Sequence, residues 1–246
     1  MNETLRTQQA HRSIRSFKPD PVSEEILDQL IAAAHQAPTS MNAQEISLVV
    51  VRDAGKRARI AELAGGQAWI AQAPVFITIV IDFHKTDLGV RKAGQTQIIH
   101  ETMEGFGVAA VDAGIVLGTL ITAAESLGLG IVPIGGIRRN PPDLIDLLGL
   151  PPLTFPLVGL CIGHIANNAP QKPRMDINTF RHDERYDAGS YAAAIDAYDV
   201  VIVEYWRQFG RGDGGSWSSN LGNFYRQMYF PQVKPVAAMQ GLLNDK

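Results

Sequence analysis

The sequence predicts an α+β or mixed α/β fold in three layers, in which helices cover a central sheet. Short apolar runs rich in β-branched residues alternate along the chain with amphipathic runs of helical period, the pattern of strands and surface helices. In addition, residues 104–127 are apolar almost all round. A helix of this kind has to be buried on every side, by the core or by a partner subunit.

Length and composition fit one large globular domain, with or without an appended arm. A chain of 246 residues, 46% of them hydrophobic and 19% charged, can bury a sizeable core. The net charge of −3 lacks the basic footprint of a nucleic-acid-binding protein. The single cysteine, Cys161, excludes an internal disulfide framework and favours a reducing compartment.

The sequence also predicts a soluble, cytoplasmic protein. Residues 1–6 lack the apolar segment of a signal peptide. The longest apolar stretch, residues 108–124, is interrupted by Asp112 and falls short of the roughly 20 residues that a membrane span needs. We therefore expect neither a membrane nor a nucleic acid as a partner.

The first predicted elements are two helices and two strands in alternation. Ser23 is a good N-cap, and acidic residues and an apolar stripe follow it as far as Ala34, which predicts a helix. Residues 46–51 are β-branched and predict a strand. Residues 56–64 return to a helical pattern. Residues 75–81 are apolar nearly throughout, as in a strand buried on both faces.

The middle of the chain is predicted to add two strands after an irregular segment. Residues 82–100 are polar and lack a clear period, so we expect a mobile excursion there. The apolar helix of residues 104–127 follows. Further β-branched runs predict strands at residues 131–134 and 155–162, with a helix at residues 144–148 between them.

The chain changes character after Lys172. Residues 176–187 are polar and irregular, and residues 191–206 have the pattern of an amphipathic helix. Residues 210–215 form a glycine-rich loop that precedes a final helix. We expect this part to form an arm.

Three motifs are better explained by structure than by chemistry. Residues 105–110 match the dinucleotide pattern G-x-G-x-x-A, but helical residues precede them where that motif needs a strand. Small residues that let two helices approach are the better interpretation. His100-Glu101 lacks the second histidine of a zinc motif, so we predict no metal site. Cys161 lies in an apolar strand pattern, which indicates a buried, inert thiol.

Four polar segments combine into a candidate binding site. His11–Arg15 offers two guanidinium groups, a hydroxyl and an imidazole, which suit one phosphate group. Residues 38–44 offer hydroxyls and amides, and residues 133–136 end in paired glycines that allow close backbone approach to a flat ligand. Lys172 and Arg174 add two cations. Each segment alone reads as an ordinary turn or linker, but together they fit the phosphate, ribityl chain and heterocycle of FMN.

These segments resemble the FMN-dependent nitroreductase superfamily, in the branch of the major oxygen-insensitive nitroreductases and the NADPH:flavin reductases. The resemblance covers residues 1 to about 175 well and the tail more loosely. The matching motifs occur in the family's order and spacing: His11–Phe17, Ala37–Gln44, Gly65–Gln67, Ala123–Gly130, Pro133–Gly136 and Lys172–Arg174, then Trp217 and Tyr229–Pro231.

The resemblance implies a fold and a reaction. The fold would have a central, mostly antiparallel sheet flanked by helices, with an FMN-binding core over residues 1–175. Residues 176–246 would be an extension of the same domain that wraps the partner of a homodimer. The reaction would be an NAD(P)H-dependent, ping-pong, two-electron reduction of nitroaromatics, quinones or free flavin. No side chain is expected to be catalytic, because the flavin itself carries the hydride.

The resemblance also implies cofactor ligands. Two of these ligands, Arg15 and Gln67, would also stabilise the negative charge that develops near N1 and O2 of the reduced flavin. The expected ligands are His11, Arg12, Ser13 and Arg15 for the phosphate and ribityl chain, Ser40 and Asn42 beside the flavin, Gln67 at the pyrimidine edge, Pro133, Ile134, Gly135 and Gly136 along the ring, and Lys172 and Arg174 to complete the phosphate clamp.

Three residues are candidates for substrate and coenzyme contacts. Trp69 would line the open face of the flavin, and Arg207 and Arg211 would bind the 2′-phosphate of NADPH. Related enzymes carry more cations here, whereas this chain has Asp213 among glycines. The preference between NADPH and NADH therefore stays open. We expect residues 82–100 and 210–216 to shape the acceptor pocket.

Three alternatives remain open at this stage. The same fold could serve a dedicated flavin-dependent dehydrogenation or dehalogenation. The protein could instead bind FMN as a sensor without catalysis. Finally, the four segments could be ordinary turns in a protein without flavin.

Overall fold

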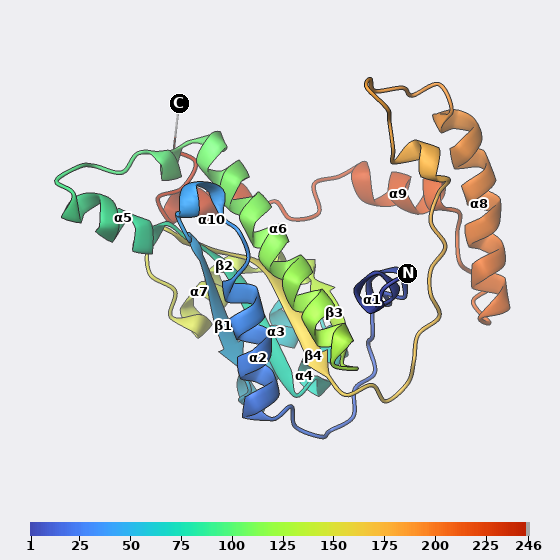
Figure 1. Cartoon of the computed structure of the whole chain (residues 1–246), viewed down its shortest axis with the longest axis horizontal. Helices are drawn as coiled ribbons and strands as arrows, with labels where there is room; N and C mark the ends of the chain where they lie inside the picture. The colour runs from blue at the N-terminus through green and yellow to red at the C-terminus, as the bar shows by residue number, and fades with distance from the viewer. Residues whose placement is uncertain (245–246) are drawn as a thin grey trace. The chain divides into compact units, whose positions relative to one another are not determined.

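Four antiparallel strands form one sheet in the order β1-β2-β4-β3 (Figure 1). The structure is a computed structural model that describes residues 1–244. The strands are β1 (Ile46–Val51), β2 (Val75–Asp82), β3 (Gly130–Ile134) and β4 (Thr154–Gly163). Every neighbouring pair is antiparallel. The predicted strands and the predicted antiparallel sheet are confirmed.

The chain forms two compact units, which are described separately. The first comprises Met1–Ala169 and the residues from Phe230 on, and it contains the whole sheet. The second comprises Pro170–Tyr229.

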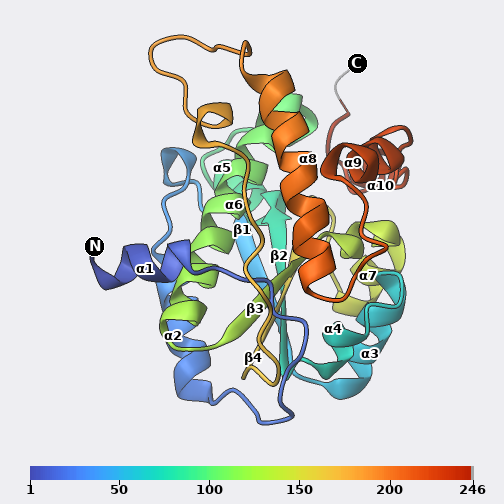
Figure 2. The same cartoon turned by 90° about the vertical axis from the view of Figure 1, so that its right-hand side faces the viewer.

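Helices cover both faces of the sheet in the first unit. Alternate residues of β2 point to opposite faces. Ile77 and Ile79 pack with α2 (Glu24–His35) and α6 (Met103–Ser126), whereas Phe76 packs on the other face. The helices on that face, visible in Figure 2, are α3 (Ala54–Leu63), α4 (Ala68–Gln72) and α7 (Pro141–Leu148). The predicted three layers are therefore confirmed.

Local signals set the ends of α2 and α3 as expected. The Ser23 hydroxyl accepts a hydrogen bond from the Ile26 amide at 3.3 Å, which caps α2. After α3, Gly65 and Gly66 have φ of 89° and 78°, a backbone conformation that favours glycine.

The prediction of an irregular segment at residues 82–100 is wrong, because α5 (Phe83–Lys92) forms there. The Asp82 carboxylate accepts from the Lys85 amide at 3.0 Å and caps the helix. Gln97 is buried, and its amide nitrogen donates to the Phe83 carbonyl at 3.1 Å. The anchoring contacts of this segment thus join polar side chains to backbone groups, and the buried residues of α5, Phe83 and Asp87, form no apolar stripe.

The long apolar helix α6 is confirmed, and so is the structural interpretation of its glycines. A β carbon on Gly105 would lie 2.0 Å from the Ile99 carbonyl oxygen, so glycine allows the helix to begin directly against the preceding turn. A short 3₁₀ helix, Ile99–Glu101, precedes it where a dinucleotide motif needs a strand. By length and composition α6 could cross a membrane, but its buried positions recur every three or four residues and pack against α2 and the sheet.

The remaining α-helices are divided between the two units. In the first unit these are α1 (Glu3–Gln9) and α10 (Val233–Met239), and Val236 and Ala237 of α10 pack with Phe155 of β4. In the second unit these are α8 (Tyr191–Gln208) and α9 (Trp217–Tyr225). The single final helix that we predicted is therefore two helices, α9 and α10, with Pro231 in the segment between them.

We predict that Gly159→Ala lowers the free energy of unfolding by about 1–3 kcal/mol, the usual cost of overpacking a core. A β carbon at Gly159 would lie 2.3 Å from Cζ of the fully buried Phe76. Gly89→Ala in α5 is the matched control, because a β carbon there would meet no neighbouring side chain of residues 1–244 within 4 Å. It should raise stability by about 0.5–1 kcal/mol. Urea unfolding measures both, and an unchanged Gly159→Ala midpoint would contradict the packing described here.

Candidate functional site

The segment His11–Arg15 runs alongside the edge strand β3. The Ile14 amide donates to the Ile131 carbonyl at 2.8 Å, and Ser13 pairs with Ile131 in a parallel bridge. Extended backbone sends alternate side chains to opposite sides. Arg12 accordingly lines a cavity, whereas the Arg15 guanidinium carbon lies 5.6 Å from the centroid of the Trp69 ring. The two predicted phosphate ligands thus face different surroundings.

Gly136 and Gln67 meet at the start of α4. Gln67 is the N-cap residue of α4, and its side-chain nitrogen donates to the Ala64 carbonyl at 2.9 Å. A β carbon on Gly136 would lie 2.2 Å from that nitrogen and 2.8 Å from the Ala64 oxygen. Only glycine allows this approach. Trp69 follows near the start of α4, so the structure brings Arg15, Gln67, Trp69 and Gly136 to one place.

Pro133, Ile134 and Gly135, the other residues predicted to contact the flavin ring, differ in their exposure and in their positions. Pro133 is half-buried at the end of β3. Ile134 is 1% exposed and belongs to the core, so only its backbone is available to a ligand. Gly135 opens the 3₁₀ helix Gly135–Arg139, and a β carbon there would lie 3.2 Å from a guanidinium nitrogen of Arg138. Sequence reasoning could not separate backbone from side-chain roles here.

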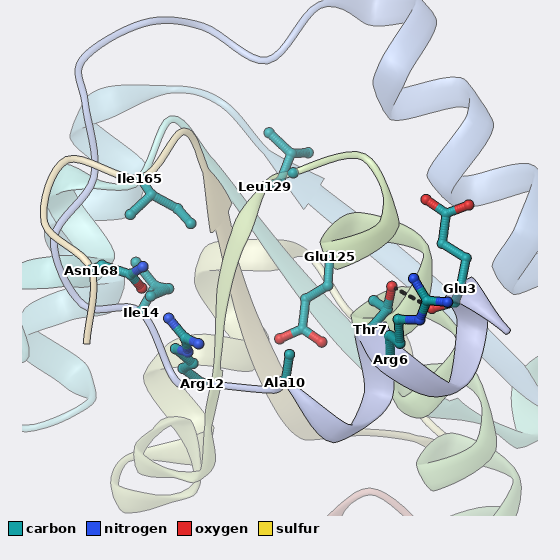
Figure 3. Close-up of a pocket in the computed structure, with 11 residues that line it drawn as sticks. Glu3, Arg6, Thr7, Ala10, Arg12, Ile14, Glu125, Leu129, Ile165 and Asn168 are labelled. Carbon is teal, nitrogen blue, oxygen red and sulfur yellow. Dashed lines mark hydrogen bonds between the residues drawn. The ribbon is translucent and has the colours of Figure 1, made fainter. Parts of the chain in front are cut away.

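A cavity of about 780 Å³ opens beside Arg12, between α1 and the end of α6 (Figure 3). Its volume falls within the usual range of ligand pockets. Its charged lining residues are Glu3, Arg6, Arg12 and Glu125. Arg6 donates to the Met1 carbonyl at 2.8 and 3.2 Å, so its guanidinium is already engaged.

His11 and Arg12 differ in their hydrogen-bond partners beside this cavity. The Nδ1 atom of His11 lies 2.7 Å from Oε1 of Glu125. The Nε atom of Arg12 and the second carboxylate oxygen of Glu125 are both buried, and within residues 1–244 neither has a hydrogen-bond partner. A buried N–H donor without a partner is costly. An anionic oxygen at this position would satisfy it, which fits a phosphate.

Ser40 and Asn42 lie in a strained loop elsewhere in the first unit. Met41, Asn42 and Gln44 have φ of 53°, 56° and 55°, in the left-handed region that non-glycine residues rarely adopt. The Ser40 amide donates to the Asp112 carboxylate at 2.9 Å. Asp112 precedes Glu125 by more than three turns of α6, roughly 20 Å along the helix axis. This chain therefore does not bring Ser40 and Asn42 to His11.

Two buried acids lie close to each other beside this loop. The exposed fractions of Glu45 and Asp112 are 2% and 3%. Burial raises the pKa of the Glu45 carboxyl, and the nearby Asp112 carboxylate raises it further. A hydrogen bond from the Glu45 backbone amide and the positive charge of Lys85 lower the pKa, but the net shift is upward.

Sequence reasoning assigned no role at the site to Glu45, Asp112 or Glu125. The sequence does contain a sign that Asp112 has a structural role. An acid inside an otherwise apolar helix needs a polar partner, so its position predicts a buried contact.

The second unit places two of its four predicted basic residues, Lys172 and Arg211, against Trp206. The Lys172 ammonium nitrogen lies 4.9 Å and the Arg211 guanidinium carbon 4.7 Å from the centroid of the Trp206 ring. Arg174 donates to the Lys172 carbonyl at 3.3 Å. Arg207, in contrast, pairs with Glu204 at 2.6 Å, so its charge is compensated.

Cys161 has the environment of a structural thiol. Its exposed fraction is 0%, and it packs in the core cluster with Phe76 and Val132. Burial raises the pKa of the thiol well above its ordinary value, which disfavours the thiolate. The predicted buried, inert thiol fits this environment.

The sequence matches family profiles along nearly its whole length. A profile described as "Nitroreductase family" matches residues 9–164. A second, described as "Nitroreductase family, C-terminal domain", matches residues 172–245.

Individual relatives match over the full chain. The chain is 41% identical to a Bacillus subtilis (strain 168) protein named FMN reductase, NAD(P)H, over all of both chains. The structure of B. megaterium NfrA2 superposes with a TM-score of 0.97 at 39% identity, covering all of both chains. The NADPH:FMN oxidoreductase from Vibrio harveyi, complexed with NAD+, superposes with a TM-score of 0.90 at 31% identity over 99% of this chain and 100% of that one.

We predict that Glu45→Gln gains stability relative to the wild type as the pH rises above 4.5, the ordinary pKa of a glutamate. The folded protein holds the Glu45 pKa above its ordinary value of 4.5, so the wild type loses stability as the pH rises through the folded pKa. Gln stays neutral and avoids this loss. Urea unfolding across this pH range measures the difference.

The control is Glu62→Gln, which alters an exposed carboxylate paired with Arg59. Its stability relative to the wild type should not rise with pH. A Glu45→Gln difference that is independent of pH would contradict the account of the buried acids.

Proposed function

The chain belongs to the nitroreductase family, and we propose that it holds FMN where residues 11–15, 67–69 and 133–136 meet. As a family member with 41% identity to an FMN reductase over its full length, it is an NAD(P)H-dependent flavin reductase or nitroreductase. The observation that carries the proposed cofactor is the convergence of Arg15, Gln67, Trp69 and Gly136 around the start of α4.

Bound FMN would supply the redox chemistry, taking a hydride from NAD(P)H and passing two electrons to the acceptor. The protein would bind and orient it. Arg12 would neutralise phosphate charge, Arg15 beside Trp69 would stabilise negative charge near flavin N1 and O2, and the Gly135 and Gly136 backbone would approach the ring edge. Gln67 uses its amide nitrogen on Ala64, which leaves its amide oxygen to accept from the pyrimidine edge. Trp69 would line the open face.

We further propose a homodimer in which a second copy supplies Ser40 and Asn42 to each site. Their separation from His11 within one chain, about 20 Å along α6, supports this arrangement. The exposed face of α6 also supports it, because small and apolar side chains there would allow a close symmetric contact. That face consists of Gly107, Val111, Gly114, Ile115 and Gly118.

Of the predicted arm, residues 176–246, we propose that the part up to Tyr229 wraps the partner subunit, because α10 packs on β4 of its own chain. Within the second unit, exposed aromatic and apolar side chains support a contact surface of this kind. They include Phe180, Phe224, Tyr225 and Met228, which are 62–86% exposed.

The proposed acceptors are nitroaromatics, quinones and free flavin, and the proposed compartment is the cytoplasm. Lys172 and Arg174 stay predicted phosphate ligands on the family resemblance alone. Of the two candidates for the 2′-phosphate of NADPH, Arg211 is the stronger, because Arg207 is already paired with Glu204.

We predict that Arg12→Ala weakens FMN binding by about 10- to 100-fold, the cost of losing charged hydrogen bonds to phosphate. Its affinity for riboflavin, which lacks the phosphate, should change by less than about twofold. Arg6→Ala is the matched control, since Arg6 lines the same cavity but is bonded to the Met1 carbonyl. Fluorescence titration of the apoprotein measures the affinities. Equal losses for both flavins would contradict the assignment of Arg12 to the phosphate.

We predict that Arg211→Ala raises the KM for NADPH by about tenfold and that for NADH by less than about twofold, because only NADPH carries the 2′-phosphate. Arg207→Ala should change both KM values little, given its pairing with Glu204. Steady-state kinetics with each coenzyme measure these values. A similar rise for both coenzymes in Arg211→Ala would refute the assignment.

A further inference from the structure

The acid Glu125 occupies an electrostatically unfavourable position at the end of α6. It is in the last turn of that helix, where the helix dipole favours cations. Its side chain is only 12% exposed, and no basic residue lies in the same turn. A carboxylate in this place needs a compensating partner. Its partner is His11, which is 114 positions away in sequence and approaches to 2.7 Å.

The chemistry of this contact fixes the state of the His11 ring. An ionised carboxylate only accepts hydrogen bonds, so Nδ1 of His11 carries the hydrogen that bonds to Glu125. The ring is thereby held in one orientation, and Nε2 is its remaining polar atom. A phosphate oxygen could accept a hydrogen bond from Nε2 when that nitrogen carries a hydrogen, and a P–OH group could donate to Nε2 when it does not.

We infer that Glu125 is a positioning residue that holds His11 for the phosphate group of FMN. This inference rests on the proposed function. Arg12 supports it, because its buried Nε lacks a partner within residues 1–244 and lines the same cavity as Glu125 (Figure 3). A bare carboxylate beside a phosphate would repel it. With the His11 ring bonded to Glu125, that carboxylate oxygen would face Nδ1 instead of the phosphate.

The test compares FMN with riboflavin, because only FMN has the phosphate. Glu125→Leu removes the acceptor and should weaken FMN binding by at least about fivefold, with riboflavin affinity changed by less than about twofold. Glu125→Gln keeps an oxygen that accepts from Nδ1, so it should retain most of the FMN affinity. Glu104→Leu is the matched control, since Glu104 is an exposed acid in the first turn of the same helix and does not line this cavity. It should leave both affinities unchanged.

A double-mutant cycle tests whether Glu125 acts through His11. In a His11→Ala background, Glu125→Leu should cause no further loss of FMN affinity. An independent readout is the ¹⁵N NMR spectrum of the wild-type protein, which should show His11 protonated at Nδ1. That spectrum needs no variant and therefore serves even if Glu125→Leu fails to fold.

The outcomes separate the two ideas. If the wild type binds FMN no better than riboflavin, the proposed phosphate site fails and the inference fails with it. If the wild type prefers FMN but Glu125→Leu keeps that preference, or binds FMN more tightly, the inference alone is overturned. A wild-type His11 ring protonated only at Nε2, or an equal loss for both flavins, also overturns it.

Discussion

Gly136 leaves no room for a β carbon between the 3₁₀ helix Gly135–Arg139 and the start of α4, and the proposed flavin site depends on that close approach. Any side chain at Gly136 would collide with Gln67 and with the Ala64 carbonyl. This close approach places the end of β3 beside the start of α4, where Gln67 and Trp69 lie. The pairing of Ser13 with Ile131 then adds Arg15 to the same place. Backbone geometry therefore assembles three segments that are distant in sequence.

The helix α6 organises the rest of the site. Its buried positions pack on α2 and the sheet, and two of its three acids each contact a predicted ligand segment. Asp112 accepts from the Ser40 amide, and Glu125 accepts from His11. Because these acids are roughly 20 Å apart along the helix, the two predicted ligand segments lie apart within one chain, which is why we propose that two copies combine them. The exposed glycine-containing face of α6 is where a second copy would join them.

Sequence reasoning predicted the elements whose residues repeat with a clear local period, such as β1, β2 and α6. It missed α5, because Asp82 and Gln97 anchor that helix with polar bonds instead of an apolar stripe. It identified candidate residues of the site. It did not predict that Arg12 and Arg15 face different surroundings, or that Arg207 forms an ion pair with Glu204. Those facts depend on contacts between distant segments or on rotamers, neither of which leaves a periodic signal.

The most direct test of the proposed flavin site is an anaerobic stopped-flow experiment that follows the visible flavin absorbance. The purified protein, reconstituted with FMN if necessary, is mixed with NADPH and then with a nitroaromatic or quinone. The account predicts rapid bleaching by NADPH and recovery of the colour when the acceptor is added. A yellow protein that does not bleach would favour a sensor or a dedicated substrate. A colourless protein that cannot take up FMN would contradict the site itself.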